Sequence, residues 1–547
     1  MIILGITHPI SWNPAACLLI DGKLVAFSEE ERFIRLKHAP NVFPEMAIKA
    51  CLEKAGVNPH NIEATAIGFS RPDERNICSI DAASYLSGAL SEERLFEYHT
   101  SLALLNADSR IKPYGNKMYF DHHLCHAASA AIPSGFEETN VLTLDGWGGD
   151  SSGLLGTFNK DSGFQTYYNI SPYNSWGITY ELITEYLGFR CHSGEGKTMG
   201  LASYGKVDSK LLPSFCEPEF GLPDVRKYEQ YLKSHFSPRP PSAELEVWHQ
   251  NMAATLQSYY EHSLIRIAET LAKRSRYKRY VLAGGVTLNC SGNGRLAEQD
   301  FVDDLFIQPA SHDAGTALGA AILAHRELSG AWPDVNFSHA YWGQSFSDSE
   351  IKQALDFARI PYQHCDPSQM AAEALAKNEV VGWFQGAAEV GPRALGNRSI
   401  LAHPGHPANL DRVNQQVKRR EKWRPLAPSV LAEKYFDVFN CRHLSPYMLL
   451  AAQVNTHWKD KLSAIVHIDG SARPQSVMKE TNPKYHQLIQ NFENMTGLPV
   501  VLNTSFNLDD EPLVNSPENA IATFFRSGVE TLVIGSYVIR KKWLHET

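Results

Sequence analysis

A strand followed by a hairpin occurs twice in this chain, and this repetition constrains the fold more than any other feature. The first copy runs through IILGIT, AACLLIDG and KLVAFSEEE in residues 2–31, where an Asp-Gly-Lys sequence marks the turn. The second copy runs through VLTLDGWGGD, SSGLLGTFNKD and SGFQTYYN in residues 141–169. Two copies of one unit predict a duplicated fold.

Helices alternate with these strands. Residues 44–54 and 248–273 have the amphipathic spacing of helices, and YVLAGGV (280–286) and VDDLFIQPA (302–310) predict strands between helices. The alternation predicts an α/β fold built in layers. A duplicated strand-hairpin unit in such a chain is typical of the actin-like ATPase superfold, whose two halves hold a ligand between them.

A second domain is expected because a chain of 547 residues exceeds the size at which one hydrophobic core keeps growing. The segment GQSFSDSEIKQAL (343–355) has the signals of a turn and a helix start, and EVVGWFQG (379–386) begins a new strand-led unit. We therefore expect one domain over residues 1–345 and another over residues 346–547.

Charge and composition exclude several classes of protein. A net charge of -9 offers no basic excess for a nucleic-acid backbone, so we expect no nucleic-acid partner. No apolar run approaches the roughly 18 residues of a membrane span, and the N-terminal segment has no basic region of a signal peptide. The nine cysteines form no CxxC pair and suit reduced thiols. We expect a cytoplasmic protein, with a symmetric homodimer as the expected assembly if it associates.

The sequence DHHLCHAASA carries a candidate metal site. His122 and His126 stand four residues apart on a predicted helix and so project from one face. Asp145 ends the buried strand VLTLD, and Asp313 opens a helix in SHDAGTALGAAIL; buried carboxylates are unfavourable unless they are paired or bind metal. Two His and two Asp suit iron, manganese or zinc. The alternative for Asp313 is a helix cap, and His123 is expected to be a supporting neighbour.

Two glycine-rich segments, EGKTMGLASYG (195–205) and AGGVTLN (283–289), are candidates for nucleotide binding. Neither is a Walker A loop, so phosphate contact would rest on backbone amides at helix starts. The alternative is a pair of tight turns in an α/β sheet. The candidate nucleotide-binding residues here are Gly284, Gly285 and Asn289.

Cationic side chains gather among turn residues in the C-terminal half, in GPRALGNRS, VKRREKWRPLAPS and HIDGSARPQSV. Guanidinium forks match phosphate oxygens, so the set favours a polyanion pocket over a series of surface ion pairs. The buried strand VVLNTSFN adds polar groups at its end. The candidate residues are Arg393, Arg398, Lys418, Arg424, Arg473, Asn503, Thr504 and Ser505.

Four segments are specific as a set: EEERFIRLKH, HHLCHAASA, GPRALGNRS and LNTSFN. Over nearly its whole length the chain resembles the O-carbamoyltransferases of antibiotic, toxin and nodulation-factor biosynthesis. The resemblance implies an N-terminal domain similar to the tRNA threonylcarbamoyl transferase TsaD, of actin-like fold. It implies a C-terminal domain similar to YrdC, an α/β fold on a twisted sheet.

The resemblance also implies a reaction in two steps. A C-terminal site joins carbamoyl phosphate and Mg-ATP into carbamoyl adenylate, and the adenylate moves to an N-terminal site where a hydroxyl of a small molecule attacks its carbonyl. Iron(II) or another divalent transition metal is implied at the N-terminal site, with the ligands His122, His126, Asp145 and Asp313. The implied C-terminal residues are Arg393, Lys418, Arg424, Arg473 and Ser505, of which Lys418, Arg424 and Arg473 are the expected catalytic members.

The chain departs from the family pattern at two places. The His-Asp pair that follows the first strand in the family is replaced by Trp12 and Asn13, which leaves His8 as the candidate general base. The Arg-Met pair after WFQG is replaced by Ala387 and Ala388, so one expected anion contact is lost.

Other functions share parts of the pattern. A tRNA threonylcarbamoyl-type transferase has both domain types, but the acidic charge balance disfavours it. A hydrogenase-maturation carbamoyltransferase would carry CxxC zinc motifs. A non-catalytic actin-like sensor would bind ATP without releasing pyrophosphate, and a sugar kinase would leave the C-terminal anion pocket without a purpose. The hydroxyl acceptor is expected to contact residues 70–108 and 170–192.

Overall fold

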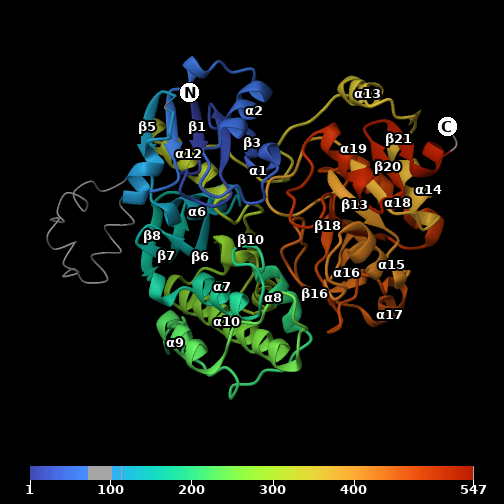
Figure 1. Ribbon diagram of the computed structural model, residues 1–547. Helices are drawn as coiled ribbons and strands as arrows, with labels where there is room; N and C mark the ends of the chain where they lie inside the picture. The colour runs from blue at the N-terminus through green and yellow to red at the C-terminus, as the bar shows by residue number, and fades with distance from the viewer. Residues whose placement is uncertain (72–101, 113, 546–547) are drawn as a thin grey trace.

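The computed structural model describes residues 1–71, 102–112 and 114–545 (Figure 1). Two five-stranded sheets in its N-terminal part share one topology. The orders are β3-β2-β1-β4-β5 and β8-β7-β6-β9-β10, with an antiparallel hairpin on one side of the first strand and parallel strands on the other. The predicted duplication is therefore confirmed, and the fold is α/β with a duplicated actin-like part. The strands are β1 (Ile2–Ile6), β2 (Ala15–Ile20), β3 (Lys23–Glu29), β4 (Ala64–Ile67), β5 (Asn116–Tyr119), β6 (Glu138–Gly148), β7 (Ser151–Asn159), β8 (Gly163–Ile170), β9 (Arg279–Ala283) and β10 (Asp304–Ile307).

The first hairpin turns where the sequence predicts it. Asp21 and Gly22 both have positive φ, 48° and 77°, the backbone of a type I′ turn that joins β2 to β3. Glycine is favoured at the second position because an L side chain is strained there.

Two helices, α6 (His122–Ala131) and α12 (Ala314–Ser329), form the layer between the two sheets. Helix α6 packs on β6 and β9, α12 packs on β1 and β4, and the two helices contact each other. Their backbones approach closely because Gly319 lacks a side chain: a Cβ there would lie 1.8 Å from the Cys125 carbonyl oxygen. This layer supplies most of the candidate metal site.

The other helices of the N-terminal part cover the outer faces, with α9 and α10 at the lower edge in Figure 1. The predicted helices at 44–54 and 248–273 are confirmed, with ends shifted by one or two residues. The helices are α1 (Glu31–Ile34), α2 (Glu45–Ala55), α7 (Trp176–Tyr186), α8 (Glu195–Ala202), α9 (Val225–His235), α10 (Val247–Ser275) and α11 (Cys290–Ala297).

An eight-stranded mixed sheet forms the centre of the C-terminal part, in the order β11-β21-β20-β12-β13-β19-β14-β18. Helices cover both faces of this sheet, as two consecutive residues of β12 show. Trp383 packs in a core with α14 and α18 on one face, and Phe384 packs in a core with α13 and α19 on the other. Its elements are β11 (Gln363–His364), β12 (Val381–Phe384), β13 (Arg398–Ala402), β14 (Ala427–Leu431), β18 (Gln475–Val477), β19 (Val500–Ser505), β20 (Thr531–Ile534), β21 (Tyr537–Arg540), α13 (Asp348–Phe357), α14 (Pro367–Ala376), α18 (Pro483–Thr496) and α19 (Pro517–Arg526).

Shorter elements complete the C-terminal part. A three-stranded sheet lies beside the large one, and a π-helical turn, η4, precedes the predicted anion-binding residue Lys418. These elements are β15 (Phe439–Asn440), β16 (Ala452–Val454), β17 (Ser471–Ala472), α15 (Ala408–Asp411), η4 (Arg412–Val417), α16 (Tyr435–Val438) and α17 (Thr456–Lys459).

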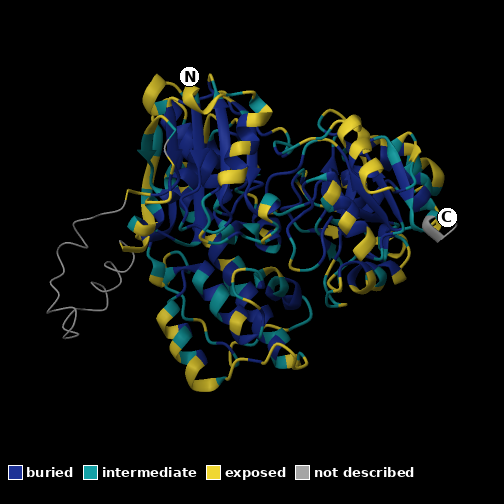
Figure 2. Cartoon of the chain, turned by 45° about the horizontal axis from the view of Figure 1, so that its top comes forward, coloured by how far each residue is buried: buried dark blue, intermediate teal, exposed yellow. Residues whose placement is uncertain are grey.

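Buried contacts join the two parts. The Arg32 guanidinium donates to the Gly391 carbonyl oxygen at 2.7 Å, and the Asn293 amide donates to the Leu449 carbonyl oxygen at 3.0 Å. Figure 2 shows that buried residues fill both sheet layers and that exposed residues concentrate on the outer helices and loops. Among the described residues no helix combines the length and the apolarity needed to cross a membrane.

Candidate functional site

The start of α6 delivers two imidazoles to one point. The Asp121 carboxylate accepts a hydrogen bond from the Leu124 amide at 2.8 Å and so caps the helix immediately before the histidines. One turn of helix separates His122 from His126, and their Nε2 atoms lie 3.2 Å apart. The predicted shared face is confirmed.

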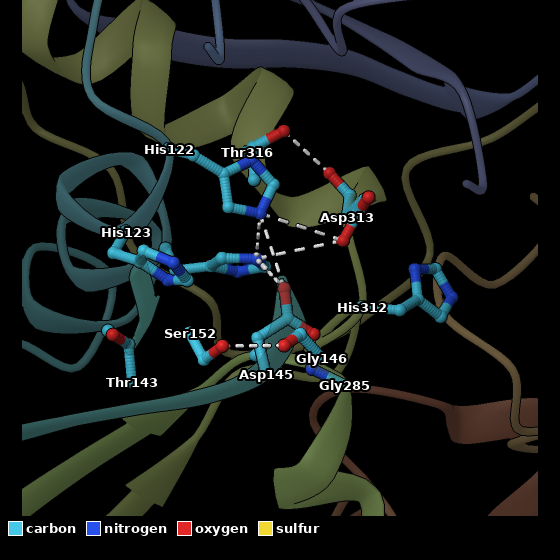
Figure 3. A network of polar contacts seen from close by, with 12 residues as sticks. His122, His123, Thr143, Asp145, Gly146, Ser152, Gly285, His312, Asp313 and Thr316 are labelled. Carbon is cyan, nitrogen blue, oxygen red and sulfur yellow. Dashed lines mark hydrogen bonds and ion pairs between the residues drawn. The ribbon is translucent and has the colours of Figure 1, made fainter. Parts of the chain in front are cut away.

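Two carboxylates from other elements meet these imidazoles (Figure 3). Asp145 Oδ2 lies 3.2 Å from His122 Nε2 and 3.4 Å from His126 Nε2. Asp313 Oδ1 lies 3.8 Å from each of the same nitrogens. The four ligand atoms all lie within 4.8 Å of one another, although the residues are spread over almost 200 positions of sequence.

Neighbouring groups orient this cluster. The His122 Nδ1 is 3.3 Å from the Gly68 carbonyl oxygen, which favours the tautomer with a free Nε2 lone pair. The Gly285 amide donates to Asp145 Oδ1 at 3.1 Å, and the Trp12 amide donates to Asp313 Oδ2 at 3.2 Å. Asp313 is the N-cap residue immediately before α12, but within the described residues its side chain forms no helix-capping hydrogen bond. Its carboxylate is directed to the cluster.

The charges of the cluster stabilise each other. Burial alone would lower the pKa of His126, but hydrogen bonds to Asp145 and Asp313 outweigh it and raise that pKa to about 9. The same pairing overcomes burial at Asp145 and holds its pKa well below the usual range. Two facing Nε2 atoms with two carboxylates form an N2O2 donor set, which fits a divalent transition metal in place of the shared proton.

Two residues beside the cluster keep its shape. His123 Nε2 is 2.9 Å from the Ser151 carbonyl oxygen, so this histidine is the supporting neighbour that the sequence predicts. Gly148 is packed on His122: a Cβ there would lie 2.1 Å from the imidazole Cδ2. The sequence analysis missed Gly148, although its place in the DGWGG run marks it as a point of close approach.

We name His122, His126, Asp145 and Asp313 the metal cluster. The predicted glycine-rich residues lie beside this cluster and near the start of α11. Gly284 has a φ of 91° and contacts the Leu144 carbonyl oxygen, while the Gly285 amide binds Asp145 as described above. The Asn289 side chain accepts from the Gly292 amide at 3.0 Å and exchanges hydrogen bonds with Gln257. These groups support Asp145 and the start of α11.

His8, the candidate base, is fully buried. Its Nδ1 accepts from the Ile10 amide at 3.3 Å, its ring packs against Phe69, and among the described residues its Nε2 has no hydrogen-bond partner. Burial lowers the pKa of His8 to about 4. The contacts are those of a neutral imidazole packed into the protein.

Lys418 forms the centre of the second site. Its Nζ donates to the Ser505 carbonyl oxygen at 2.8 Å, to Ser505 Oγ at 3.1 Å and to the Asn507 carbonyl and side-chain oxygens. Burial, with the charge of Arg420, lowers the pKa of this ammonium well below its usual range. The structure thus joins Lys418 to Ser505, as expected, and adds Asn507, which the sequence analysis did not select.

Several arginines lie near this lysine, and among the described residues only Arg424 of this set forms an ion pair, with Glu421 at 3.6 Å. Burial and the charge of Arg473 lower the pKa of Arg393 to about 9, and burial and the charge of Arg424 lower the pKa of Arg420 to about 9. In the part of the chain that the structure describes, the buried Nε atoms of Arg393 and Arg473 have no hydrogen-bond partner. Arg420 was missed because the π-helical turn η4 changes which members of VKRREKWR face inward.

Two predicted phosphate-binding residues, Arg398 and Asn503, form hydrogen bonds with other groups of the protein. The Arg398 guanidinium donates to the carbonyl oxygens of Gln385, Gly386, Asn397 and Gln344, and it lies 3.7 Å from the centre of the Phe384 ring. Asn503 is fully buried and donates to the Ala394 carbonyl oxygen and to Ser429 Oγ.

A buried clamp connects the two sites. Glu29 Oε1 accepts from Arg32 at 3.0 Å and from the Gly391 amide at 2.8 Å. Glu29 Oε2 is 3.5 Å from His312 Nε2, beside the metal-cluster residue Asp313. Gly391 begins the loop that carries Arg393. We name Glu29, Arg32 and Gly391 the interdomain clamp; the sequence contains it in EEER and GPR, but nothing in either motif shows that they meet.

The expected acceptor-binding segments are placed in part. Residues 72–101 of the first segment lie outside the described residues. The second, 170–192, contains α7 and ends at His192, whose ring lies 4.1 Å from the Trp12 ring between centroids. Ala388, at the second departure from the family pattern, is buried and exchanges backbone hydrogen bonds with Gly343 and Gln344.

Comparisons with known proteins match two family models to this chain. A family model described as the carbamoyltransferase N-terminus matches residues 2–322, and one described as the carbamoyltransferase C-terminus matches residues 372–541. The nodulation protein NolNO of Sinorhizobium fredii is 37% identical over 98% of this chain and 80% of its own length. A 3'-hydroxymethylcephem-O-carbamoyltransferase of Amycolatopsis lactamdurans is 35% identical over 49% of this chain and 51% of its own. The crystal structure of HypF from T. kodakarensis has a TM-score of 0.36 and 13% identity, over 60% of this chain and 48% of its own.

Proposed function

The chain belongs to the carbamoyltransferase family and is an enzyme that transfers carbamoyl groups, and from this premise we propose that it uses carbamoyl phosphate and Mg-ATP to carbamoylate a hydroxyl of a small molecule. The C-terminal domain, residues 346–547, makes carbamoyl adenylate. The N-terminal domain, residues 1–345, transfers the carbamoyl group to the acceptor. The relatives of the chain include a protein named as an O-carbamoyltransferase, which supports a hydroxyl as the acceptor.

The observation that carries this proposal is the excess of positive charge at the second site, where five cations lie near only two carboxylates of the described residues, Glu421 and Asp509. Four guanidinium or ammonium groups with lowered pKa values share one partly buried region. Buried like charges destabilise a fold unless a counter-charge joins them. Adenylate formation brings that counter-charge, because carbamoyl phosphate and the ATP triphosphate must meet there. The residues that would bind it are Arg393, Lys418, Arg420, Arg424 and Arg473.

In the first step, water splits carbamoyl phosphate into carbamate and phosphate. A carbamate oxygen then attacks the α-phosphorus of ATP, carbamoyl adenylate forms and pyrophosphate leaves. Lys418 Nζ, fixed by Ser505 and Asn507, is a preorganised cation for the charge that develops on the phosphate oxygens. Arg393 and Arg473 provide planar forks for further phosphate oxygens. Mg²⁺ bound to the nucleotide would complete the neutralisation.

In the second step, the adenylate's carbonyl faces the N-terminal cluster. His122, His126, Asp145 and Asp313 would hold a divalent metal such as iron(II), which would polarise that carbonyl as a Lewis acid. The Gly285 and Trp12 amides keep the two carboxylates in place. The buried contact between the domains shields the labile adenylate from water.

Pyrophosphate release tests the proposal directly. Purified protein with ATP, Mg²⁺ and carbamoyl phosphate is expected to release pyrophosphate, and omission of either substrate is expected to stop it. Lys418→Ala should abolish the release. The matched control is Lys422→Ala, since Lys422 lies in the same segment but is exposed.

The alternatives predict other results. An actin-like sensor would bind ATP and release no pyrophosphate with both substrates present. A tRNA-modifying enzyme would need threonine and bicarbonate in place of carbamoyl phosphate. Either result would overturn the proposed reaction.

A further inference from the structure

A histidine-glutamate pair lies outside the groups used so far. His192 Nδ1 is 3.0 Å from Glu181 Oε1, on α7. The His192 backbone has a positive φ of 61°, and its amide donates to Glu195 Oε1 at 2.8 Å, so the start of α8 holds this uncommon conformation. The side chain of His192 is 37% exposed, whereas the cluster imidazoles of His122 and His126 are buried. An oriented, accessible imidazole is suited to proton transfer.

Each member of this pair contacts a neighbour of a metal-cluster residue. The His192 ring packs on Trp12, whose amide donates to Asp313 Oδ2. On the other side, Glu181 Oε1 lies 3.5 Å from the position that a Cβ would take on Gly146, the residue after Asp145. The pair therefore flanks the two carboxylates of the cluster.

The exposure of the cluster shows where a substrate approaches. The side chains of Asp145 and Asp313 are 11% and 15% exposed, while those of the two imidazoles are 1% and 0% exposed. The carboxylates are thus the more exposed part of the metal cluster, and His192 and Glu181 contact neighbours of both carboxylates.

Cys191 also lies near this pair, and Glu181, Cys191 and His192 are close enough to hold a metal. Burial, followed by the charges of Glu181 and Glu195, raises the pKa of the Cys191 thiol to about 12. A metal held by these three residues is the competing assignment, and the zinc measurement described below distinguishes it from a proton-transfer role for the histidine.

We propose that His192, oriented by Glu181, is the general base that activates the acceptor hydroxyl. The inference rests on the carbamoyl transfer proposed above and adds a catalytic residue to it. The acceptor oxygen forms a bond to the carbonyl carbon of carbamoyl adenylate, and its proton passes to His192 Nε2. The bond from that carbon to the phosphate oxygen breaks, AMP leaves, and the Glu181 carboxylate stabilises the imidazolium until it loses the proton to solvent.

The test measures the two steps separately in the full-length protein. Pyrophosphate release reports adenylate formation, and the carbamate ester of glycerol, supplied at high concentration as the hydroxyl probe, reports transfer. His192→Gln should lower ester formation by about 10²- to 10⁴-fold, the usual contribution of a general base. It should leave pyrophosphate release within about twofold. Glu181→Gln should have a smaller effect on the same step.

Two further variants separate a base from a structural role. Ester formation by His192→Gly should be partly restored by added imidazole, which a structural defect would not show. His262→Gln, at an exposed position of α10, is the matched control and should leave both steps unchanged.

Four results would count against the inference or its premise. Normal ester formation in His192→Gln overturns it, and so does stoichiometric zinc that is lost equally in His192→Gln and Cys191→Ser. Pyrophosphate release with no ester in the unmodified protein contradicts the hydroxyl-transfer step of the proposed function itself. No pyrophosphate release contradicts its first step.

Discussion

The two sites of this chain are built on opposite electrostatic plans. In the metal cluster, imidazoles face carboxylates, which raises the pKa of His126 and lowers that of Asp145. In the anion pocket, formed by Arg393, Lys418, Arg420, Arg424 and Arg473, burial and neighbouring cations lower the pKa values of Arg393 and Arg420. The metal cluster is balanced by the protein itself, whereas the anion pocket is balanced only when a polyanion binds.

The supporting structure differs in the same way. The metal-cluster residues stand on α6, on β6 and at the cap of α12. The cations stand in segments between regular elements of the C-terminal part: Arg393 between β12 and β13, Lys418, Arg420 and Arg424 between η4 and β14, and Arg473 between β17 and β18. A site that must admit and release large anions at each turnover is suited to the edge between domains, where loops can adjust. The following predictions test this contrast.

Arg473→Met should have the largest effect. It removes a fork for phosphate, so pyrophosphate release should fall by about 10²- to 10³-fold, the usual loss for one preorganised charge-stabilising group. It also removes one of several repelling buried charges, so the melting temperature of the nucleotide-free protein should stay level or rise. Calorimetry and the pyrophosphate assay measure the two outcomes, and a marked drop in melting temperature would contradict the charge-repulsion argument.

Asp145→Asn should show the reverse pattern. It leaves the His126 charge with one carboxylate fewer, so the melting temperature should fall, by an amount equivalent to about 3 kcal/mol if the cost is typical of a broken buried pair. Bound metal, measured by atomic absorption, should be lost, and ester formation should fall by at least about 10²-fold. Pyrophosphate release should persist, because the C-terminal site is unchanged. Equal loss of both steps would show that the sites are not separable.

Glu29→Gln in the interdomain clamp should have a moderate effect. The variant keeps the shape but weakens the charged hydrogen bonds to Arg32 and the Gly391 amide. Adenylate should then escape between the sites, so the ester formed per pyrophosphate should fall by about tenfold while pyrophosphate release stays near normal. The matched control is Glu63→Gln, at an exposed residue whose side chain, within the described structure, has polar contacts only with Met1 and Ile2. An unchanged ratio in Glu29→Gln would exclude a role of the clamp in transfer.

The sequence predicts the duplicated sheets and the metal cluster well, because both depend on local signals. The strand-hairpin repeat, the His pair at helical spacing and the strand-ending Asp145 each have a local pattern that the structure confirms. The clamp and the pair of His192 with Glu181 have no such pattern. Their members are unremarkable along the chain and meet only through the packing of α7 or of the two domains.

The arginines of GPRALGNRS show a second limit of prediction from sequence. Arg393 and Arg398 are five residues apart in one motif, and the sequence predicts phosphate contact for both. The structure commits the terminal nitrogens of Arg398 to four backbone carbonyl oxygens, whereas within the described part of the chain the Arg393 side chain forms no hydrogen bond. Whether an arginine serves the fold or a ligand depends on which carbonyl groups reach it, and backbone conformation decides that.

The smallest expected effect is a pH dependence of the metal-free protein. The pKa of His126 is raised from about 6.5 to about 9 by Asp145 and Asp313, so its contribution to stability is fully present below pH 6.5 and is lost as pH rises through 9. The melting temperature of protein treated with a chelator should therefore fall by a few degrees between pH 6.5 and 9. This fall should be absent from His126→Gln. It should persist in His123→Gln, because burial lowers the pKa of His123 to about 4 and that group does not titrate in this range. An identical change of melting temperature with pH in both variants would place the titrating group outside the metal cluster. It would also contradict the contrast between a site neutralised by its own residues and a site neutralised by a bound anion.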